Sequence, residues 1–435
     1  LDRQIHSSVG CSIHTVIFQH EIHFVSGEDK KLKDIKAGRE KTLTAQVLKN
    51  LYTLPYTVHA TPTAFLTYHE KFVPPNYVLD PNVHLISIEK EVAKFLEVDA
   101  SLDILNLRKN PIFHFSQTAN VKRIIVMQLS DFRTLLDSLE DDNRPVVWMF
   151  HTIRCGSTVW SQIFNALPNW SVLSEPQTMF YNMMSVRTET NDLQLQQVFE
   201  SSEYEEWLVA IIKMYLRLLP KENHVFWKEH GAMTDQIIPI IHRRFSHHKI
   251  MLAYRDVLPN AMSFYKAFGH LPRFLNYVKH IYDDISNMNL GGDARFGRLF
   301  YTNGYNPTLC SKAIIKSNLQ PNAFEWSTLL WATKVRMFRQ FKDEGIEIKC
   351  VKYDSIRDRP EKIIAEVFEY LDIPSEYVEH GLQSLKLDSQ DGLFFSWKNR
   401  AANETWRMTE ECTKRCNILL REMGIDGDMN SITNL

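Results

Sequence analysis

V-V-W-M-F-H-T-I-R-C-G-S-T-V-W, residues 146–160, is the stretch from which the fold of this chain can be argued. It opens with the apolar, strand-forming run Val146 to Phe150, passes through a polar loop, and turns helical from Val159 onward. A helix that follows such a loop directs its free N–H groups and the positive end of its dipole at an anion. The loop also carries groups that suit a phosphate, namely a flexible glycine, two hydroxyls and a guanidinium, from Gly156, Ser157, Thr158 and Arg154. The stretch therefore predicts a phosphate-binding loop, while an ordinary strand–turn–helix connection has the same layout.

The loop departs from the Walker A sequence G-x-x-x-x-G-K-[ST] of ATPases and GTPases. The first glycine of that motif is absent, and Ser157 stands where its lysine would be. An ATP-using P-loop kinase is kept as an alternative, but it needs a P-loop lysine and a Mg²⁺-binding aspartate, and the sequence places neither.

Three further motifs follow the loop along the chain. They are an apolar strand that ends in Lys-x-His, a strand that ends in Arg-Asp with a serine eight residues after the arginine, and a late strand followed by an amphipathic helix: Phe226–His230, Lys249–Ser263 and Ile348–Pro374. In order and spacing, these motifs and the loop resemble the sulfotransferases that use 3′-phosphoadenosine 5′-phosphosulfate (PAPS). The resemblance covers roughly residues 143–425 and has a divergent character.

The resemblance implies which residues hold the donor. Arg154 and the N–H groups of Gly156 to Thr158 would bind the 5′-phosphate and the leaving oxygens, and Cys155 of the same loop is counted among the donor-binding residues. Arg255 at its strand end and Ser263 on the next helix would bind the 3′-phosphate, the group that separates PAPS from ATP.

The resemblance also implies how a proton leaves the acceptor. His230 is the first candidate for the general base, because imidazole titrates near neutral pH. Glu175, at the end of the second strand, is the competing base, since a glutamate in that region serves in some branches of the family. Lys228 would steady the sulfonate or the leaving oxygen. No metal is required for this chemistry in the family, and none is expected here.

Two departures from the family's pattern affect nucleotide binding. The tryptophan that stacks on adenine in the cytosolic branch is displaced by one position, to Trp160, and one helical step turns a side chain by about 100°. The C-terminal segment Gln390–Lys398 keeps Gly, Trp and Lys but loses both cations of the family's pattern. This loss implies either weaker nucleotide affinity or binding of the 3′-phosphate by Lys398 or Arg400 instead. The lost cations favour a second alternative, a catalytically inactive nucleotide-binding protein on the same fold.

Short apolar strands that alternate with helices predict an α/β fold, a P-loop-type three-layer sandwich with a central, mostly parallel sheet. We expect an N-terminal α/β extension of unknown role at 1–142, a PAPS-binding sulfotransferase domain at 143–425 and a C-terminal tail at 426–435. In the extension the patterns predict strands, helices and one proline-rich loop: strands at 11–25, 84–88 and 123–129, helices at 45–52, 89–97 and 130–139 with Ser130 as N-cap, and the loop at 53–81.

The composition limits the classes of partner that this chain is expected to have. A net charge of −2 over 435 residues gives no nucleic-acid signature. No run of about 18 apolar residues occurs, so no membrane span is expected. The six cysteines are scattered and form no C-x-x-C, which favours a cytoplasmic location, and the histidines fit no zinc spacing. The expected partner is a small-molecule acceptor with a hydroxyl or amine, with PAP as the second product, and an oligomer is possible. The aromatic segments 296–305 and 394–397 are typical either of the wall of an acceptor pocket or of the core.

Overall fold

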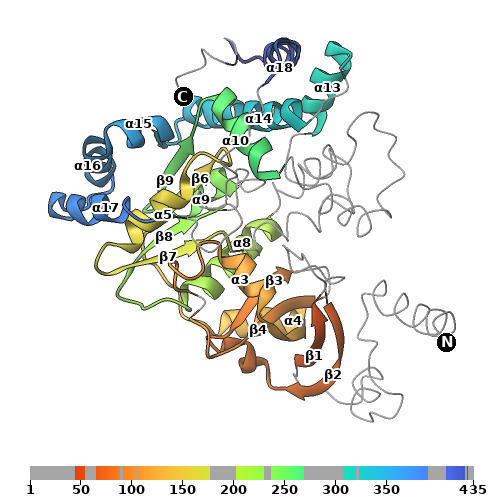
Figure 1. The fold of residues 1–435 in the computed structure, drawn as a ribbon. Helices are drawn as coiled ribbons and strands as arrows, with labels where there is room; N and C mark the ends of the chain where they lie inside the picture. The colour runs from red at the N-terminus through yellow and green to blue at the C-terminus, as the bar shows by residue number, and fades with distance from the viewer. Residues whose placement is uncertain are drawn as a thin grey trace. The chain divides into compact units, whose positions relative to one another are not determined.

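The computed structural model describes residues 45–53, 65–88, 92–103, 105–176, 202–229, 237–268, 307–319, 323–389, 408–426 and 429. The chain divides into two compact units. Unit 1 comprises residues 1–102 and 114–141, and unit 2 comprises residues 103–113 and 142–435. Figure 1 colours the described residues of both units by their number.

Unit 1 is built on a five-stranded antiparallel sheet in the order β2-β1-β5-β4-β3. The strands are β1 (Ala45–Thr53), β2 (Phe65–Val73), β3 (Val83–Ile88), β4 (Val92–Val98) and β5 (Val121–Gln128). The short 3-10 helix η2 (Pro75–Leu79) lies between β2 and β3 in the chain, and helices α3 (Phe113–Ala119) and α4 (Leu129–Asp137) lie on either side of β5 in the chain.

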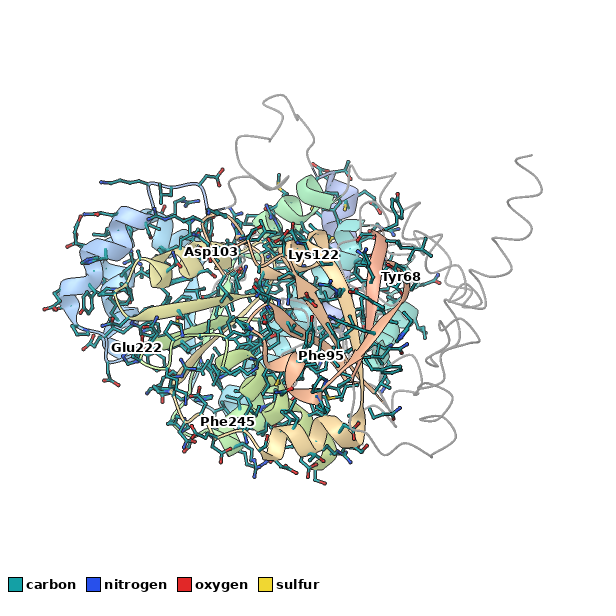
Figure 2. All side chains as sticks on the ribbon, turned by 90° about the horizontal axis from the view of Figure 1, so that it is seen from below. Tyr68, Phe95, Asp103, Lys122, Glu222 and Phe245 are labelled. Atoms are coloured by element: carbon teal, nitrogen blue, oxygen red, sulfur yellow. The ribbon has the colours of Figure 1, made fainter. Side chains whose placement is uncertain are left out.

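Helix α4 covers part of this sheet. Phe132 of α4 packs edge-on against Phe95 of β4, with ring centroids 5.5 Å apart, and both rings are fully buried. Tyr68, on the edge strand β2, is 40% exposed; Figure 2 labels it together with Phe95. The core of unit 1 therefore extends over the strands from β5 to β3, and β2 forms a largely exposed edge.

The helix expected at 45–52 is wrong, because this segment is strand β1. It pairs with β2 on one side and with β5 on the other. Register shifts at Val47/Leu48 and Asn50/Tyr52 interrupt the alternation of inward and outward side chains. Without that alternation the apolar residues lose the strand period, so the spacing resembled a helix.

Two other expectations in unit 1 are also wrong. Residues 92–97 of the helix expected at 89–97 belong to strand β4, and residues 89–91 lie outside the described residues. Strand β4 is buried on both faces, so its apolar residues recur without the two-residue period of a half-buried strand. The loop expected at 53–81 contains strand β2 and helix η2. Only the two end residues of β2 are buried, which leaves little hydrophobic pattern to detect.

The remaining expectations in unit 1 have mixed outcomes. Strands β3 and β5 and helix α4 are confirmed, but α4 begins one residue earlier than expected, with Gln128 rather than Ser130 at its N-cap. The strands expected at 11–25 lie outside the described residues.

Unit 2 contains a five-stranded sheet in the order β10-β9-β6-β8-β7, and every neighbouring pair is parallel. The strands are β6 (Val146–His151), β7 (Trp170–Ser174), β8 (His224–Lys228), β9 (Lys249–Tyr254) and β10 (Lys349–Lys352). The predicted α/β class with a central parallel sheet is confirmed. The order places the first strand of the unit, β6, at the centre of the sheet, where Figure 1 shows it beside β8 and β9.

Helices cover both faces of this sheet. On one face Met149, Phe226 and Met251 pack with α5 (Ser157–Asn165), α16 (Pro360–Tyr370) and α17 (Val378–Ser384). Successive residues of a strand point to opposite faces of the sheet, so the strand residues next to Met149 and Phe226 pack against helices on the other face. Phe150 contacts Phe338 of α14 (Ala323–Asp343), and Trp227 contacts Tyr215 of α8 (Ser202–Leu216), with centroid distances of 6.2 Å and 5.5 Å.

The other helices extend the unit beyond the sheet. They are α9 (Ile238–Arg244), α10 (Val257–Phe268), α13 (Pro307–Ser317), α15 (Tyr353–Asp358) and α18 (Glu410–Glu422), with a 3-10 turn η5 (Ser375–Tyr377). Helices α10, α13, α14 and α18 share one hydrophobic cluster, and Figure 1 shows them gathered together. No helix in the described ranges is both long and apolar enough to cross a membrane.

A buried histidine at the start of β9 makes stability depend on pH. The Trp148 indole N–H donates to Nδ1 of His248 at 3.0 Å, and burial lowers the pKa of His248 from 6.5 to about 3. An unfolded chain would bind a proton there between these pH values and the folded chain would not, so stability falls as the pH drops from about 6.5 towards 3.

His248→Gln is therefore expected to flatten the acid limb of the stability profile by up to a few kcal/mol. The glutamine oxygen still accepts from Trp148 but does not titrate. Urea unfolding of both proteins across this pH range measures the effect. Parallel profiles would contradict the assignment.

Candidate functional site

The five parallel strands end at one edge of the sheet of unit 2, and a polar or aromatic residue lies at or just after the end of each. These residues are Tyr353 after β10, Arg255 after β9, the loop 152–156 after β6, Lys228 at the end of β8, and Glu175 just after β7. Because parallel strands have their carboxyl ends at the same edge, the fold brings these side chains to one rim. The strand ends therefore define the candidate site.

The loop after β6 has an unusual backbone. Gly156 is the N-cap of α5, with φ of 79° and ψ of 17°, a left-handed conformation that glycine adopts readily. Ile153 and Arg154 also have positive φ, 52° each, although both carry side chains. A β-branched residue in this region is strained, so the surroundings must hold the loop in place.

The ring of Tyr353 lies against Gly156. A Cβ built on Gly156 would be 2.5 Å from Cε2 of Tyr353 and closer still to Cδ2, so only glycine fits beneath the ring. Arg255 contacts the same ring, because its guanidinium carbon lies 4.8 Å from the centroid of the Tyr353 ring. Tyr353 therefore joins the loop to Arg255 at a single rim.

Arg255 is held by backbone and ring contacts rather than by a strong ion pair. Its carbonyl accepts a hydrogen bond from the Trp331 indole at 2.7 Å, and its Nη2 lies 4.0 Å from Oδ1 of Asp354. Its Nε is buried and has no hydrogen-bond partner among the described residues. A buried donor of this kind fits an anion, because an unsatisfied charged donor is costly to bury.

Arg154 points to helix α10. Its Nε donates to the hydroxyl of Ser263 at 3.4 Å. The structure therefore brings together two residues that the sequence assigned to different phosphates, and a single nucleotide could contact both.

A buried ion pair lies at the ends of β7 and β8. Lys228 is 1% exposed, and its Nζ contacts Oε1 of Glu175 and donates to the Thr158 hydroxyl at 3.1 Å. Oε1 of Glu175 is also 3.8 Å from Nε2 of His151. Glu175 has φ of 58°, and its N–H donates to the Lys228 carbonyl at 2.8 Å, which fixes the carboxylate beside the ammonium. The pair places one cation and one carboxylate next to the first turn of α5.

His151 is held as a neutral ring beside this pair. The Ile153 N–H donates to its Nδ1 at 3.2 Å, so Nδ1 accepts. Nε2 then carries the proton and lies 2.9 Å from the Glu229 carbonyl. His151 was not singled out by the sequence, and its only signal was a polar residue closing an apolar strand.

Two predicted cofactor residues are part of the protein interior. Trp160 is 2% exposed and packs in the cluster between the sheet and α5, beside Phe164. Cys155 is also buried, its Sγ donates to the Ala253 carbonyl at 3.1 Å, and burial raises the pKa of its thiol. The structure therefore does not bring the Trp160 ring to the rim, and the Cys155 thiol is turned to the backbone of β9 inside the protein.

Three predicted residues lie outside the described part of the chain: His230, Lys398 and Arg400. The aromatic segments 296–305 and 394–397 lie outside it as well. Ser157 and Thr158, expected in the loop, are the first two residues of α5, which begins two residues earlier than expected, and both are buried. Among the described residues, no group of three or more His, Cys, Asp or Glu side chains is arranged to hold a metal ion.

Comparison with known proteins gives solved structures only. No family model and no curated protein match the chain. The sulfotransferase domain from the Curacin biosynthetic pathway is 12% identical with a TM-score of 0.37, covering 65% of this chain and 98% of that one. The sulfotransferase domain from the Synechococcus PCC 7002 olefin synthase is 12% identical with a TM-score of 0.34, covering 66% and 97%. A sulfotransferase from Alicyclobacillus acidocaldarius is 11% identical with a TM-score of 0.32, covering 64% and 92%. Likeness at this level identifies no donor, acceptor or catalytic residue of this chain.

Proposed function

We propose that this chain is a sulfotransferase that moves a sulfuryl group from PAPS to a hydroxyl or amine of a small organic acceptor, with PAP as the second product. One observation carries the proposal: the glycine loop at Gly156 and the cation Arg255 lie at one rim, joined by the ring of Tyr353. A donor with phosphates at both ends of a nucleoside needs two such anion-binding positions.

The residues present fit such a donor. The N–H groups at the start of α5 and the helix dipole suit the 5′-phosphate, and Gly156 lets that phosphate approach the backbone. The Arg255 Nε is buried without a hydrogen-bond partner among the described residues, which suits the 3′-phosphate, and Ser263 of α10 lies near the Arg154 side chain. The donor itself supplies an activated sulfuryl group, so the protein needs to position it and stabilise charge.

Lys228 would stabilise negative charge on the oxygens that leave with the phosphate. It is already held between Glu175 and Thr158, so little reorganisation accompanies the reaction. A proton must also leave the acceptor. His230 is our first candidate for that step and Glu175 the second, as the Lys-x-His pattern and the strand end each imply.

Binding measurements separate this proposal from the ATP-using alternative. Calorimetry is expected to show PAP binding without Mg²⁺ and no tight binding of ATP with Mg²⁺. The reverse result would overturn the proposal in favour of a kinase. The inactive alternative predicts PAP binding but no transfer of label from PAPS to any alcohol, phenol or amine in an acceptor screen.

Arg255→Ala is expected to weaken PAP binding by about 10- to 100-fold, the worth of a charge-assisted hydrogen bond. Binding of adenosine 5′-phosphosulfate, which lacks the 3′-phosphate, should change much less. Calorimetry with both ligands measures the difference. Arg357→Ala is a matched control, because it removes an exposed guanidinium that pairs with the same Asp354. Equal losses for both ligands would remove Arg255 from the 3′-phosphate.

A further inference from the structure

The loop after β6 is tied to helix α10 by one buried side chain. Asn260 is 2% exposed, and its Nδ2 donates to the carbonyls of Thr152 and Ile153 at 3.0 Å and 2.6 Å. The Thr152 hydroxyl lies 3.4 Å from the same nitrogen. Both N–H groups of the Asn260 side-chain amide therefore donate to backbone carbonyls at the start of the phosphate loop.

These hydrogen bonds hold a conformation that the loop would not keep by itself. Ile153 and Arg154 both have φ of 52°, which costs on the order of 1–2 kcal/mol for each residue with a side chain. Each hydrogen bond to a backbone carbonyl contributes about 1 kcal/mol. The two Asn260 bonds are thus comparable with the strain, and without them the loop could relax.

The same bonds set the direction of a neighbouring N–H group. In a trans peptide the carbonyl and the following N–H point in opposite directions, and no cis peptide bond is found in the described chain. With the Ile153 carbonyl turned to α10, the Arg154 N–H turns away from that helix. The loop N–H groups are the part of the site that suits a phosphate.

We propose that Asn260 is a positioning residue, which clamps the backbone of Thr152 and Ile153 to α10 and so keeps the loop in its anion-binding form. Asn260 and Ser263 lie three residues apart on α10, hence on one face of the helix. That face holds the loop backbone through Asn260 and the Arg154 side chain through Ser263. The inference about donor binding rests on the proposed function, but the clamp itself does not.

Asn260→Ala and Asn260→Asp test the clamp by two readouts. Hydrogen exchange of the protein without nucleotide should rise in the peptide spanning residues 152–158. PAP affinity, measured by calorimetry, should fall by about 10- to 100-fold, as expected for the loss of two hydrogen bonds. Asn260→Asp should recover part of that affinity, relative to the original protein at the same pH, near about pH 4, where a carboxyl becomes protonated and can donate.

Phe264→Leu is the control for lost packing on the same helix, because Phe264 is buried in the hydrophobic cluster of α10, against which Ile153 also packs, and a phenylalanine side chain donates no hydrogen bond to the loop. The Asn260 variants are compared with Phe264→Leu at equal thermal stability. If they lose no more PAP affinity than this control, and show no more hydrogen exchange at residues 152–158, Asn260 has only a structural role and the inference is overturned. If the unaltered protein does not bind PAP, the proposed function fails, yet the exchange measurement still decides the clamp.

Discussion

Lys228→Met is expected to lower kcat by about 100- to 1000-fold, the usual loss when one group that stabilises transition-state charge is removed. PAP binding should change far less, because the loop N–H groups and Arg255 remain. Single-turnover transfer from labelled PAPS measures the chemical step, and calorimetry measures PAP binding. A kcat within about threefold of the original would exclude Lys228 from the reaction.

The Lys228 variant also leaves Glu175 as a buried carboxylate without its ammonium partner. Removing one partner of a buried ion pair costs about 3–5 kcal/mol, so the variant could lose activity by unfolding. The double variant Lys228→Met with Glu175→Leu removes both charges and is expected to regain most of this stability. It should remain inactive, and recovery of turnover would show that the loss in the single variant came from instability.

Glu175→Gln distinguishes two roles of the Glu175 carboxylate, which are to hold Lys228 in place and to accept the proton from the acceptor. An amide can still accept a hydrogen bond from Lys228 but cannot take a proton. With His230 as the base, the variant is expected to keep kcat within about tenfold of the original, while His230→Ala abolishes turnover with PAP still bound. A loss for Glu175→Gln as large as that for Lys228→Met would instead give the proton transfer to Glu175.

The sequence predicted the sheet of unit 2 well because its strands are short apolar runs, buried on both faces and bounded by polar loops. It predicted the sheet of unit 1 poorly for the opposite reason. In β1, register shifts break the two-residue period, and in β2 only the end residues are buried. Such segments become strands through pairing with neighbours, which local spacing does not record.

The same contrast holds within the site. Lys228, Arg255 and Glu175 could be placed at one edge from sequence, because parallel strands share their carboxyl ends. The contact of Asn260 with the Ile153 carbonyl joins residues far apart in the chain, through a side chain that carries no motif. Trp160 shows a further limit: the shift by one helical position was visible in the sequence, but its burial in the core is a property of packing.

Gly156→Ala is expected to abolish PAP binding. A methyl group there would collide with Tyr353, since the built Cβ lies 2.5 Å from Cε2, and the positive φ adds on the order of 1–2 kcal/mol of strain. Relief of the collision must move either the loop or the Tyr353 ring, and both are next to the proposed phosphate positions. Calorimetry with PAP and thermal unfolding of the free protein measure the two consequences.

Gly345→Ala is a control that separates the two effects of Gly156→Ala, which are the backbone strain of a positive φ and the collision with Tyr353. Gly345 has φ of 86°, and a Cβ there would have no atom within 4 Å, so this variant should lose about 1 kcal/mol of stability and keep its PAP affinity. The double variant Gly156→Ala with Tyr353→Ala removes the colliding ring but keeps the backbone strain, so it should regain part of the thermal stability. PAP binding should stay weak in this variant, because Arg255 loses the ring on which it stacks. Unchanged PAP affinity in Gly156→Ala would mean that no phosphate binds at this loop, and the donor-binding proposal would fail with it.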